Sequence, residues 1–222
     1  MGIFQGHDYP IYRYPDYSPD IIFDIGANIG ATAVYFHAAF PGAQIFCYEP
    51  SIRNFHYLEK NTESFANIHI FPYGLYDRSS NFPIYLGKDQ CAQDSIFLNN
   101  ETTNVHETAR LVRASEELSN RGIQRISILK IDTEGCEIPI LREFEIAGGG
   151  NMLIDMLYVE YHSEEDRLNI DKLMSERFLL LFSKATQIHR GSILYISRTL
   201  ASTYPESESL RIQTPFSFKA PH

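Results

Sequence analysis

The chain has 222 residues, a formal charge of −9 at neutral pH and an ordinary hydrophobic content of 44%. This length predicts a single domain whose core needs no disulfides to stabilise it. The negative charge and the lack of a basic run argue against a nucleic-acid partner, because such binding depends on Lys and Arg neutralising phosphates. No apolar run approaches the roughly 20 residues of a membrane helix, so we expect no membrane span.

The cysteines indicate a reducing compartment. Cys47, Cys91 and Cys136 are odd in number, and no two of them have the spacing of zinc ligands. The start of the chain shows neither the basic region nor the long apolar stretch of a signal peptide. We therefore expect a cytoplasmic protein.

The two ends of the chain differ from its middle. Prolines at positions 10, 15 and 19 favour an extended, irregular arm over residues 1–20. Such an arm could cover a cofactor, but we expect it to lie on the surface. A folded domain should occupy residues 21–200, and the polar residues 201–222 should form a loose tail.

Between these ends, short apolar strands alternate with helical patterns. Strands are expected over residues 21–25, 44–49, 68–71, 82–86, 126–131, 152–161, 179–182 and 193–197. Helices are expected over residues 31–40, 52–60, 116–121, from 137 to the glycines at 148–150, and over 164–177. The alternation predicts an α/β fold with a doubly wound, mostly parallel sheet.

Two segments between the third strand and the third helix have weaker patterns. Residues 77–81 resemble the tip of a hairpin that leads into the strand over 82–86. Residues 87–110 are polar and irregular, so they are expected to form a long connection of the kind that often carries substrate contacts.

Acidic side chains lie at or just past the ends of four of the predicted parallel strands. They are Asp24, Glu49, Asp132 and Glu160. Ligands of doubly wound sheets bind beyond the carboxyl ends of the strands, so these four acids predict a binding site.

The first strand is followed by a glycine turn, Gly26-Ala27-Asn28-Ile29-Gly30, that opens a helix. Its spacing is not the G-x-G-x-x-G of nicotinamide-binding proteins, and it lacks the Gly-Lys-Ser/Thr of a P-loop. A nearby Asp24 would repel a pyrophosphate, whereas it would favour the sulfonium and ammonium groups of S-adenosylmethionine. Glu49 can accept hydrogen bonds from both ribose hydroxyls. Alternatively, the glycines only permit close packing of helix and sheet.

The motifs resemble those of a known family. The Asp-x-Gly-x-Asn-x-Gly pattern from Asp24 to Gly30, followed by Glu49, looks like the start of a class I methyltransferase. The segment Lys130 to Glu137, KIDTEGCE, strongly resembles the "K-I-D-x-E-G-x-E" signature of FkbM-like methyltransferases. Glu160-Tyr161-His162 fits a later element of that family. The resemblance covers residues 20 to 198, but the helical cap often found before the first strand is absent.

This resemblance implies a Rossmann-like class I methyltransferase domain over residues 21–200, with seven strands and an antiparallel final strand. It implies S-adenosylmethionine as cofactor and O-methylation of a small-molecule, sugar, glycan or polyketide-type hydroxyl. The expected cofactor-binding residues are Asp24, Gly26, Ala27, Asn28, Gly30, Glu49, Pro50, Gly74, Leu75 and Asp132.

The acceptor hydroxyl must lose a proton during methyl transfer, which requires a base or a metal. The expected catalytic residues are Asp132, Glu134, Glu160 and His162. Among them only His162 has an ordinary pKa, roughly 6.5, that suits a base at neutral pH. The same four side chains could instead ligate Mg²⁺ or Mn²⁺. Glu134 and Glu137 could also simply stabilise the start of the next helix.

Two other functions are compatible with the pattern. One is a catalytically silent domain that only binds S-adenosylmethionine, and the other is a nicotinamide-dependent oxidoreductase. The retained acids argue against the first, and the turn spacing argues against the second. The sequence leaves open which acceptor is used and whether the chain forms oligomers.

Overall fold

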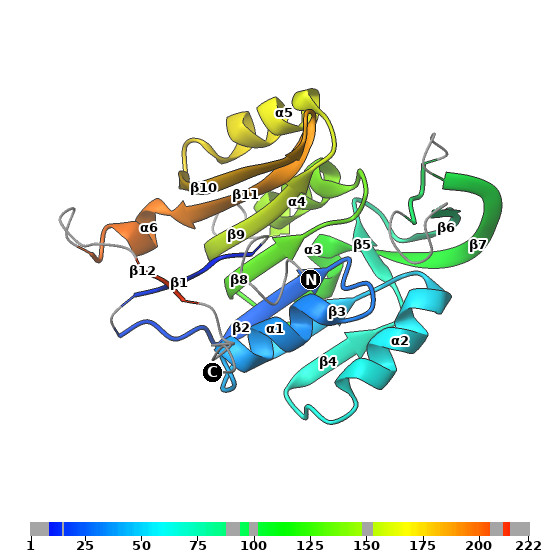
Figure 1. Ribbon diagram of the computed structural model, residues 1–222, viewed down its shortest axis with the longest axis horizontal. Coiled ribbons are helices and arrows are strands. Elements are labelled where there is room, and N and C mark those ends of the chain that lie inside the picture. The colour runs from blue at the N-terminus through cyan, green and yellow to red at the C-terminus, as the bar shows by residue number, and fades with distance from the viewer. Residues whose placement is uncertain are drawn as a thin grey trace, which may run out of the picture.

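The computed structural model describes residues 9–14, 16–87, 94–97, 102–147, 153–204 and 211–213. Its central sheet has seven strands in the order β10-β11-β9-β8-β2-β3-β4 (Figure 1). Their bounds are β2 (Ile21–Ile25), β3 (Gln44–Tyr48), β4 (Ile68–Phe71), β8 (Arg125–Ile131), β9 (Leu153–Tyr161), β10 (Phe178–Gln187) and β11 (Arg190–Ser197).

The pairing confirms the predicted fold class. Strands β2, β3, β4, β8 and β9 are parallel to their neighbours among these five. The last strand of the sheet along the chain, β11, is inserted antiparallel between β9 and β10. The sheet is therefore mostly parallel, with the antiparallel final strand that was expected.

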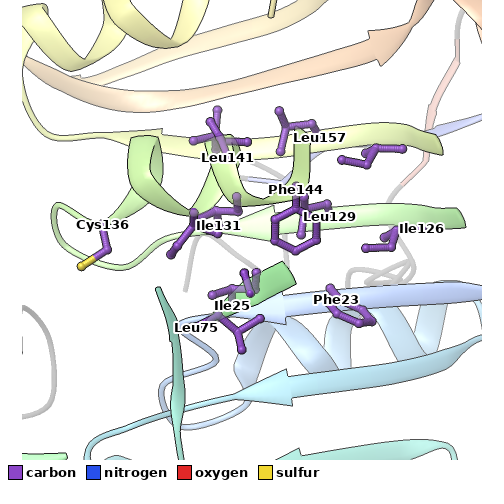
Figure 2. Packing of buried hydrophobic residues seen from close by; sticks show 14 of the residues in the cluster. Phe23, Ile25, Leu75, Ile126, Leu129, Ile131, Cys136, Leu141, Phe144 and Leu157 are labelled. Atoms are coloured by element: carbon purple, nitrogen blue, oxygen red, sulfur yellow. The ribbon is translucent and has the colours of Figure 1, made fainter. Parts of the chain in front are cut away.

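Helices cover both faces of this sheet (Figure 1). Their bounds are α1 (Ala31–Ala39), α2 (Ile52–Thr62), α3 (Ala114–Arg121), α4 (Glu137–Ala147), α5 (Glu164–Met174) and α6 (Arg198–Ala201). Successive strand residues point to opposite faces, so Ile22 packs with α1 while Phe23 packs with α3 and α4. Figure 2 shows the second of these cores, where Phe144 of α4 meets Phe23 edge-on, with ring centroids 6.4 Å apart.

A separate three-stranded sheet, in the order β5-β7-β6, lies to one side of the central sheet (Figure 1). It contains β5 (Gly74–Tyr76), β6 (Ser80–Gly87) and β7 (Thr102–Arg113). The predicted hairpin at 77–81 is wrong, because β7 lies between β5 and β6 and pairs with both. The predicted irregular connection over 87–110 is also wrong from Thr102 onward, where β7 begins.

The amino-terminal arm is packed into the protein rather than lying on its surface as expected. Its residues Tyr9, Ile11, Tyr12 and Tyr14 are buried against the sheet face that α1 also covers. The short strand β1 (Ile11–Arg13) pairs antiparallel with β12 (Arg211–Gln213), so this part of the tail is not a loose segment. In Figure 1 these two strands lie side by side, to the left of β8 and β2.

Cys47 and Cys136 are free thiols and both are buried. Cys91 and the glycines at 148–150 lie outside the described residues. Within the described ranges, no helix has both the length and the apolar character required to cross a membrane.

Candidate active site

The glycine turn between β2 and α1 lies directly on the backbone that follows β8. Gly26 has a φ of +75°, and a Cβ added there would lie 1.8 Å from the carbonyl oxygen of Asp132. Only glycine fits this contact. Gly30, with a φ of +87°, instead packs against Leu58 of α2. Close packing of α1 against α2 therefore accounts for Gly30, whereas Gly26 lets two strand ends meet.

A buried ion pair lies beneath this turn. The Nζ of Lys130 is 2.9 Å from Oδ1 of Asp24, and it donates a hydrogen bond to the carbonyl of Gly26 at 2.7 Å. Lys130 balances the charge of Asp24 and also bonds to the turn, so the buried Asp24 supports the turn through this ion pair.

Glu49, at the end of β3, is held by backbone donors. Its Oε2 accepts the N–H of Asn28 at 2.7 Å, and its Oε1 accepts the N–H of Ser51 at 2.9 Å. Burial raises the pKa of Glu49 to about 7, although the two N–H donors oppose this effect. Each carboxylate oxygen can accept a second bond, so Glu49 can still receive hydroxyl groups of a ligand.

A cavity of about 880 Å³, counted with its open mouth, lies beside Glu49. Seven of the residues expected to bind the cofactor line it, namely Gly26, Asn28, Glu49, Pro50, Gly74, Leu75 and Asp132. The remaining three, Asp24, Ala27 and Gly30, shape the turn without reaching the cavity wall.

The lining combines an apolar wall with acidic groups. Leu75, Ile84, Ile96 and Leu111 form much of the apolar part. The described lining also contains four carboxylates, those of Glu49, Asp94, Asp132 and Glu134, and neither Lys nor Arg. Such a cavity favours a cationic ligand and disfavours phosphate groups.

Two lining residues, Asp94 and Ile96, come from the connection between β6 and β7 and were not expected individually. Asp94 accepts hydrogen bonds from Arg53 at 2.8 Å and from the backbone N–H of Gly87 at 2.9 Å. A single acidic residue in a polar segment forms no sequence pattern that would indicate a ligand contact. Only the general expectation of ligand contacts from residues 87–110 pointed toward it.

The loop after β8 has an unusual backbone. Glu134 has a φ of +55° and Gly135 a φ of +116°. The side chain of Glu137, the first residue of α4, accepts the N–H of Thr133 at 2.8 Å and that of Gly135 at 3.1 Å. Glu137 therefore stabilises the loop and the start of the helix, while Glu134 lines the cavity.

His162, just after β9, lies between two carboxylates. Its Nδ1 is 3.5 Å from Glu134 Oε2, and its Nε2 is 3.4 Å from Glu137 Oε1. Burial opposes a charge on the ring, but these two neighbours outweigh it and raise the pKa of His162 to about 10. The imidazole is therefore already protonated at neutral pH. A protonated imidazole cannot accept a further proton, so His162 does not have the role of base that its ordinary pKa suggested.

Asp132 and Glu160 form a second acidic pair at the ends of β8 and β9. Burial and the charge of Asp132 raise the pKa of Glu160 to about 9. Burial alone would raise the pKa of Asp132, but Lys130 and a hydrogen bond with Glu160 hold it below its ordinary value. At neutral pH Glu160 keeps its proton and Asp132 is ionised.

The four expected catalytic residues are thus brought together. The ligand atoms of Asp132, Glu160 and His162 lie within 4.8 Å of one another, a spacing that could hold a metal ion. Glu134 does not join that group. The expectation of Mg²⁺ or Mn²⁺ stays a prediction.

Comparison with known proteins decides the family. Residues 24–186 match the model of the methyltransferase FkbM domain, which is most of the chain. This protein belongs to the FkbM methyltransferase family. It is an S-adenosylmethionine-dependent methyltransferase, in agreement with the acidic cavity that disfavours a dinucleotide.

Two relatives and one solved structure are similar to this chain. The hexuronic acid methyltransferase AglP of Haloferax volcanii is 26% identical over 182 residues, which are 81% of this chain and 70% of AglP. The 2-O-methyltransferase NoeI of Sinorhizobium fredii is 26% identical over 66% of this chain and 65% of NoeI. A fibrillarin/Nop5p complex shares the fold, with a TM-score of 0.51 and 14% identity over 83% of this chain and 76% of that chain.

Proposed function

We propose that this FkbM methyltransferase methylates a hydroxyl group of a small, carbohydrate-like acceptor, with Glu134 as the general base. The observation that carries the proposal is the cluster of carboxylates and imidazole beside the cavity. A hydroxyl acceptor must give up its proton as the new C–O bond forms, so a base next to the cofactor is needed. Glu134 lies in the cavity wall, and its carboxylate is 3.5 Å from the imidazole of His162.

The cavity residues fit S-adenosylmethionine. Glu49 would accept the ribose hydroxyls, the backbone at Gly26 and Asn28 would lie along the methionine part, and Gly74 and Leu75 would face the adenine. A Cβ on Gly74 would lie 2.7 Å from Leu111, so glycine leaves room there. The bound cofactor supplies an electrophilic methyl group on a positively charged sulfur, and the acidic lining suits that charge.

Geometry and charge give Glu134 and His162 different roles. The backbone of Glu134 is held in its left-handed conformation, and its carbonyl accepts the Ser95 hydroxyl at 2.9 Å. Burial raises the pKa of Glu134 to about 7, and His162 opposes that rise. Glu134 can therefore take a proton from a hydroxyl at neutral pH, while the imidazolium of His162 orients its carboxylate.

An exposed aromatic ring supports a carbohydrate-like acceptor. Phe97 is 47% exposed, and its ring lies 3.2 Å from where a Cβ on Gly135 would stand. A phenyl face beside the base offers an apolar platform for the C–H face of a sugar ring. The relatives whose names specify hexuronic acid and 2-O-methylation point to the same class of acceptor.

The test is an acceptor screen that measures release of S-adenosylhomocysteine. The acceptors are methyl glycosides of hexuronic acids, methyl glycosides of neutral hexoses, and simple phenols as a polyketide-like control. We expect transfer to a sugar hydroxyl, with the methyl position assigned by NMR. In Phe97→Ala the KM for the sugar should rise several-fold with little change in kcat. If S-adenosylmethionine binds but no acceptor increases its turnover, the domain is a silent binding module.

The same assay addresses the metal. Because Glu134 and His162 already supply a base and a positive charge, we expect activity to persist in excess EDTA. If EDTA abolishes turnover and Mg²⁺ restores it, the group formed by Asp132, Glu160 and His162 holds a catalytic metal instead.

A further inference from the structure

The amino-terminal arm contributes a side chain to the active site. The hydroxyl of Tyr9 donates a hydrogen bond to Oδ2 of Asp132 at 3.2 Å, although 123 residues separate the two in the chain. Tyr9 is only 6% exposed. Its hydroxyl also lies close enough to Glu160 and Asp24 for their charges to raise its pKa further, beyond the effect of burial and Asp132. It therefore stays protonated and can act only as a donor toward these acids.

The arm holds Tyr9 in this position through several anchors. The hydroxyl of Tyr35 in α1 donates to the carbonyl of Tyr9 at 3.0 Å, and the hydroxyl of Tyr158 in β9 donates to the carbonyl of Pro10 at 2.8 Å. The rings of Tyr9 and Tyr158 meet edge-on, with centroids 5.9 Å apart. Farther along, the guanidinium of Arg13 donates to the carbonyl of Ala39 at 2.6 Å. These bonds fix the backbone at Tyr9 and in the residues that follow it.

Asp132 needs such a partner because its own strand fixes only its backbone. The N–H of Asp132 donates to the carbonyl of Ile25 at 3.1 Å, and its carbonyl is covered by Gly26. Its side chain projects between the cavity and Glu160, and Lys130 is 3.7 Å away, too far for a close hydrogen bond. Tyr9 is a neutral donor to Oδ2 of this carboxylate, which also shares a hydrogen bond with Glu160.

We propose that Tyr9 is a positioning residue of the active site, which holds the Asp132 carboxylate in its working orientation and makes the arm part of the catalytic unit. The catalytic consequence rests on the function proposed above, whereas the positioning itself does not. One Asp132 oxygen is then taken by Tyr9, and the other is directed toward Glu160 and the ligand.

The chain offers a matched control for the test. Tyr14 lies in the same arm and is 7% exposed, and its hydroxyl has no hydrogen-bond partner among the described residues. Tyr9→Phe and Tyr14→Phe both keep a buried ring and remove one hydroxyl. Only the first removes a bond to the active site. Thermal unfolding of both variants shows first that each one is folded.

Two measurements then test the proposal. With saturating sugar acceptor, Tyr9→Phe should lower kcat about tenfold, the usual effect of losing a hydrogen bond to a charged group, and leave the KM for S-adenosylmethionine within about twofold. Tyr14→Phe should match the wild type. Amide hydrogen exchange over residues 132–135 should be faster in Tyr9→Phe and unchanged in Tyr14→Phe.

Equal losses of kcat in the two variants, or an unchanged kcat with unchanged exchange in Tyr9→Phe, would overturn the proposal and leave the arm a packing element. If the wild type methylates no acceptor, the proposed function fails. The exchange comparison needs no acceptor and still decides whether Tyr9 positions the loop.

Discussion

The two sides of the active site are built in different ways. On the cofactor side, the carboxylate of Glu49 is held by backbone N–H groups of Asn28 and Ser51. On the acceptor side, Glu134 faces another ionisable side chain, His162, at 3.5 Å. The first arrangement fixes the carboxylate of Glu49, a hydrogen-bond acceptor, in one orientation. The second places two ionisable side chains close enough for each to shift the pKa of the other.

This difference separates recognition from proton chemistry. Backbone donors cannot gain or lose a proton at ordinary pH, so they hold Glu49 rigidly for binding. Burial raises the pKa of Glu134 to about 7, and the neighbouring carboxylates keep His162 charged. Changes on the cofactor side should therefore reduce binding or folding, and changes on the acceptor side should reduce turnover.

The largest expected effect comes from Gly26→Ala, which affects the contact between the glycine turn and the backbone after β8. Its Cβ would lie 1.8 Å from the Asp132 carbonyl, and its φ is +75°. We expect a loss of about 3 kcal/mol or more in the free energy of unfolding, measured with denaturant. Gly42→Ala is the control, because nothing lies within 4 Å of its added Cβ. Normal stability in Gly26→Ala would show that the loop after β8 can move away.

Glu134→Gln should lower kcat without weakening the binding of S-adenosylmethionine. Removing the base while keeping the shape of the side chain should lower kcat by about a hundredfold or more. The affinity for S-adenosylmethionine, measured by calorimetry, should change little. The exposed Glu63, next to the end of α2, provides the control Glu63→Gln. Weaker cofactor binding with normal kcat would assign Glu134 to the cofactor side instead.

Glu49→Ala should damage binding alone. The loss of charge-assisted hydrogen bonds to ribose should weaken binding of S-adenosylmethionine by about 10- to 100-fold in calorimetry. Glu49→Gln retains one oxygen acceptor and should lose less. NAD serves as the control ligand and should not bind the wild type. If Glu49→Ala binds S-adenosylmethionine normally, the proposed placement of the cofactor is incorrect.

The smallest expected effect is the pH dependence of kcat. Below the pKa of Glu134, kcat should change about tenfold per pH unit. Glu134 must be ionised to accept a proton, and burial raises its pKa to about 7. Its titration is also influenced by His162, Asp132, Arg190 and Glu137. We expect kcat to rise with pH up to about 7 and then level off. A kcat that falls through pH 7 would require a protonated group instead.

The same pKa has a consequence of opposite sign for stability. The folded state binds the Glu134 proton more tightly than the unfolded state, whose carboxyl has a pKa near 4.5. The stabilisation from this group is therefore complete below about pH 4.5 and is lost as the pH rises through about 7. Thermal unfolding of Glu134→Gln should lack this component.

Local patterns in the sequence determined much of the fold and of the cofactor side. The apolar runs and helical periods predicted the doubly wound sheet, because each element buries one face and shows it in its own spacing. The glycine turn, Glu49 and the segment from Lys130 to Glu137 are short and continuous. Their chemistry can be predicted without knowing what packs against them.

The tertiary structure alone decided the features that join distant segments. The insertion of β7 between β5 and β6 depends on long-range strand pairing, which no local period records. The hydrogen bond from Tyr9 to Asp132 depends on where the folded arm packs against the sheet. The charge of His162 depends on two carboxylates from the loop after β8 and the start of α4, because a pKa is set by the neighbours of a group in space rather than in sequence.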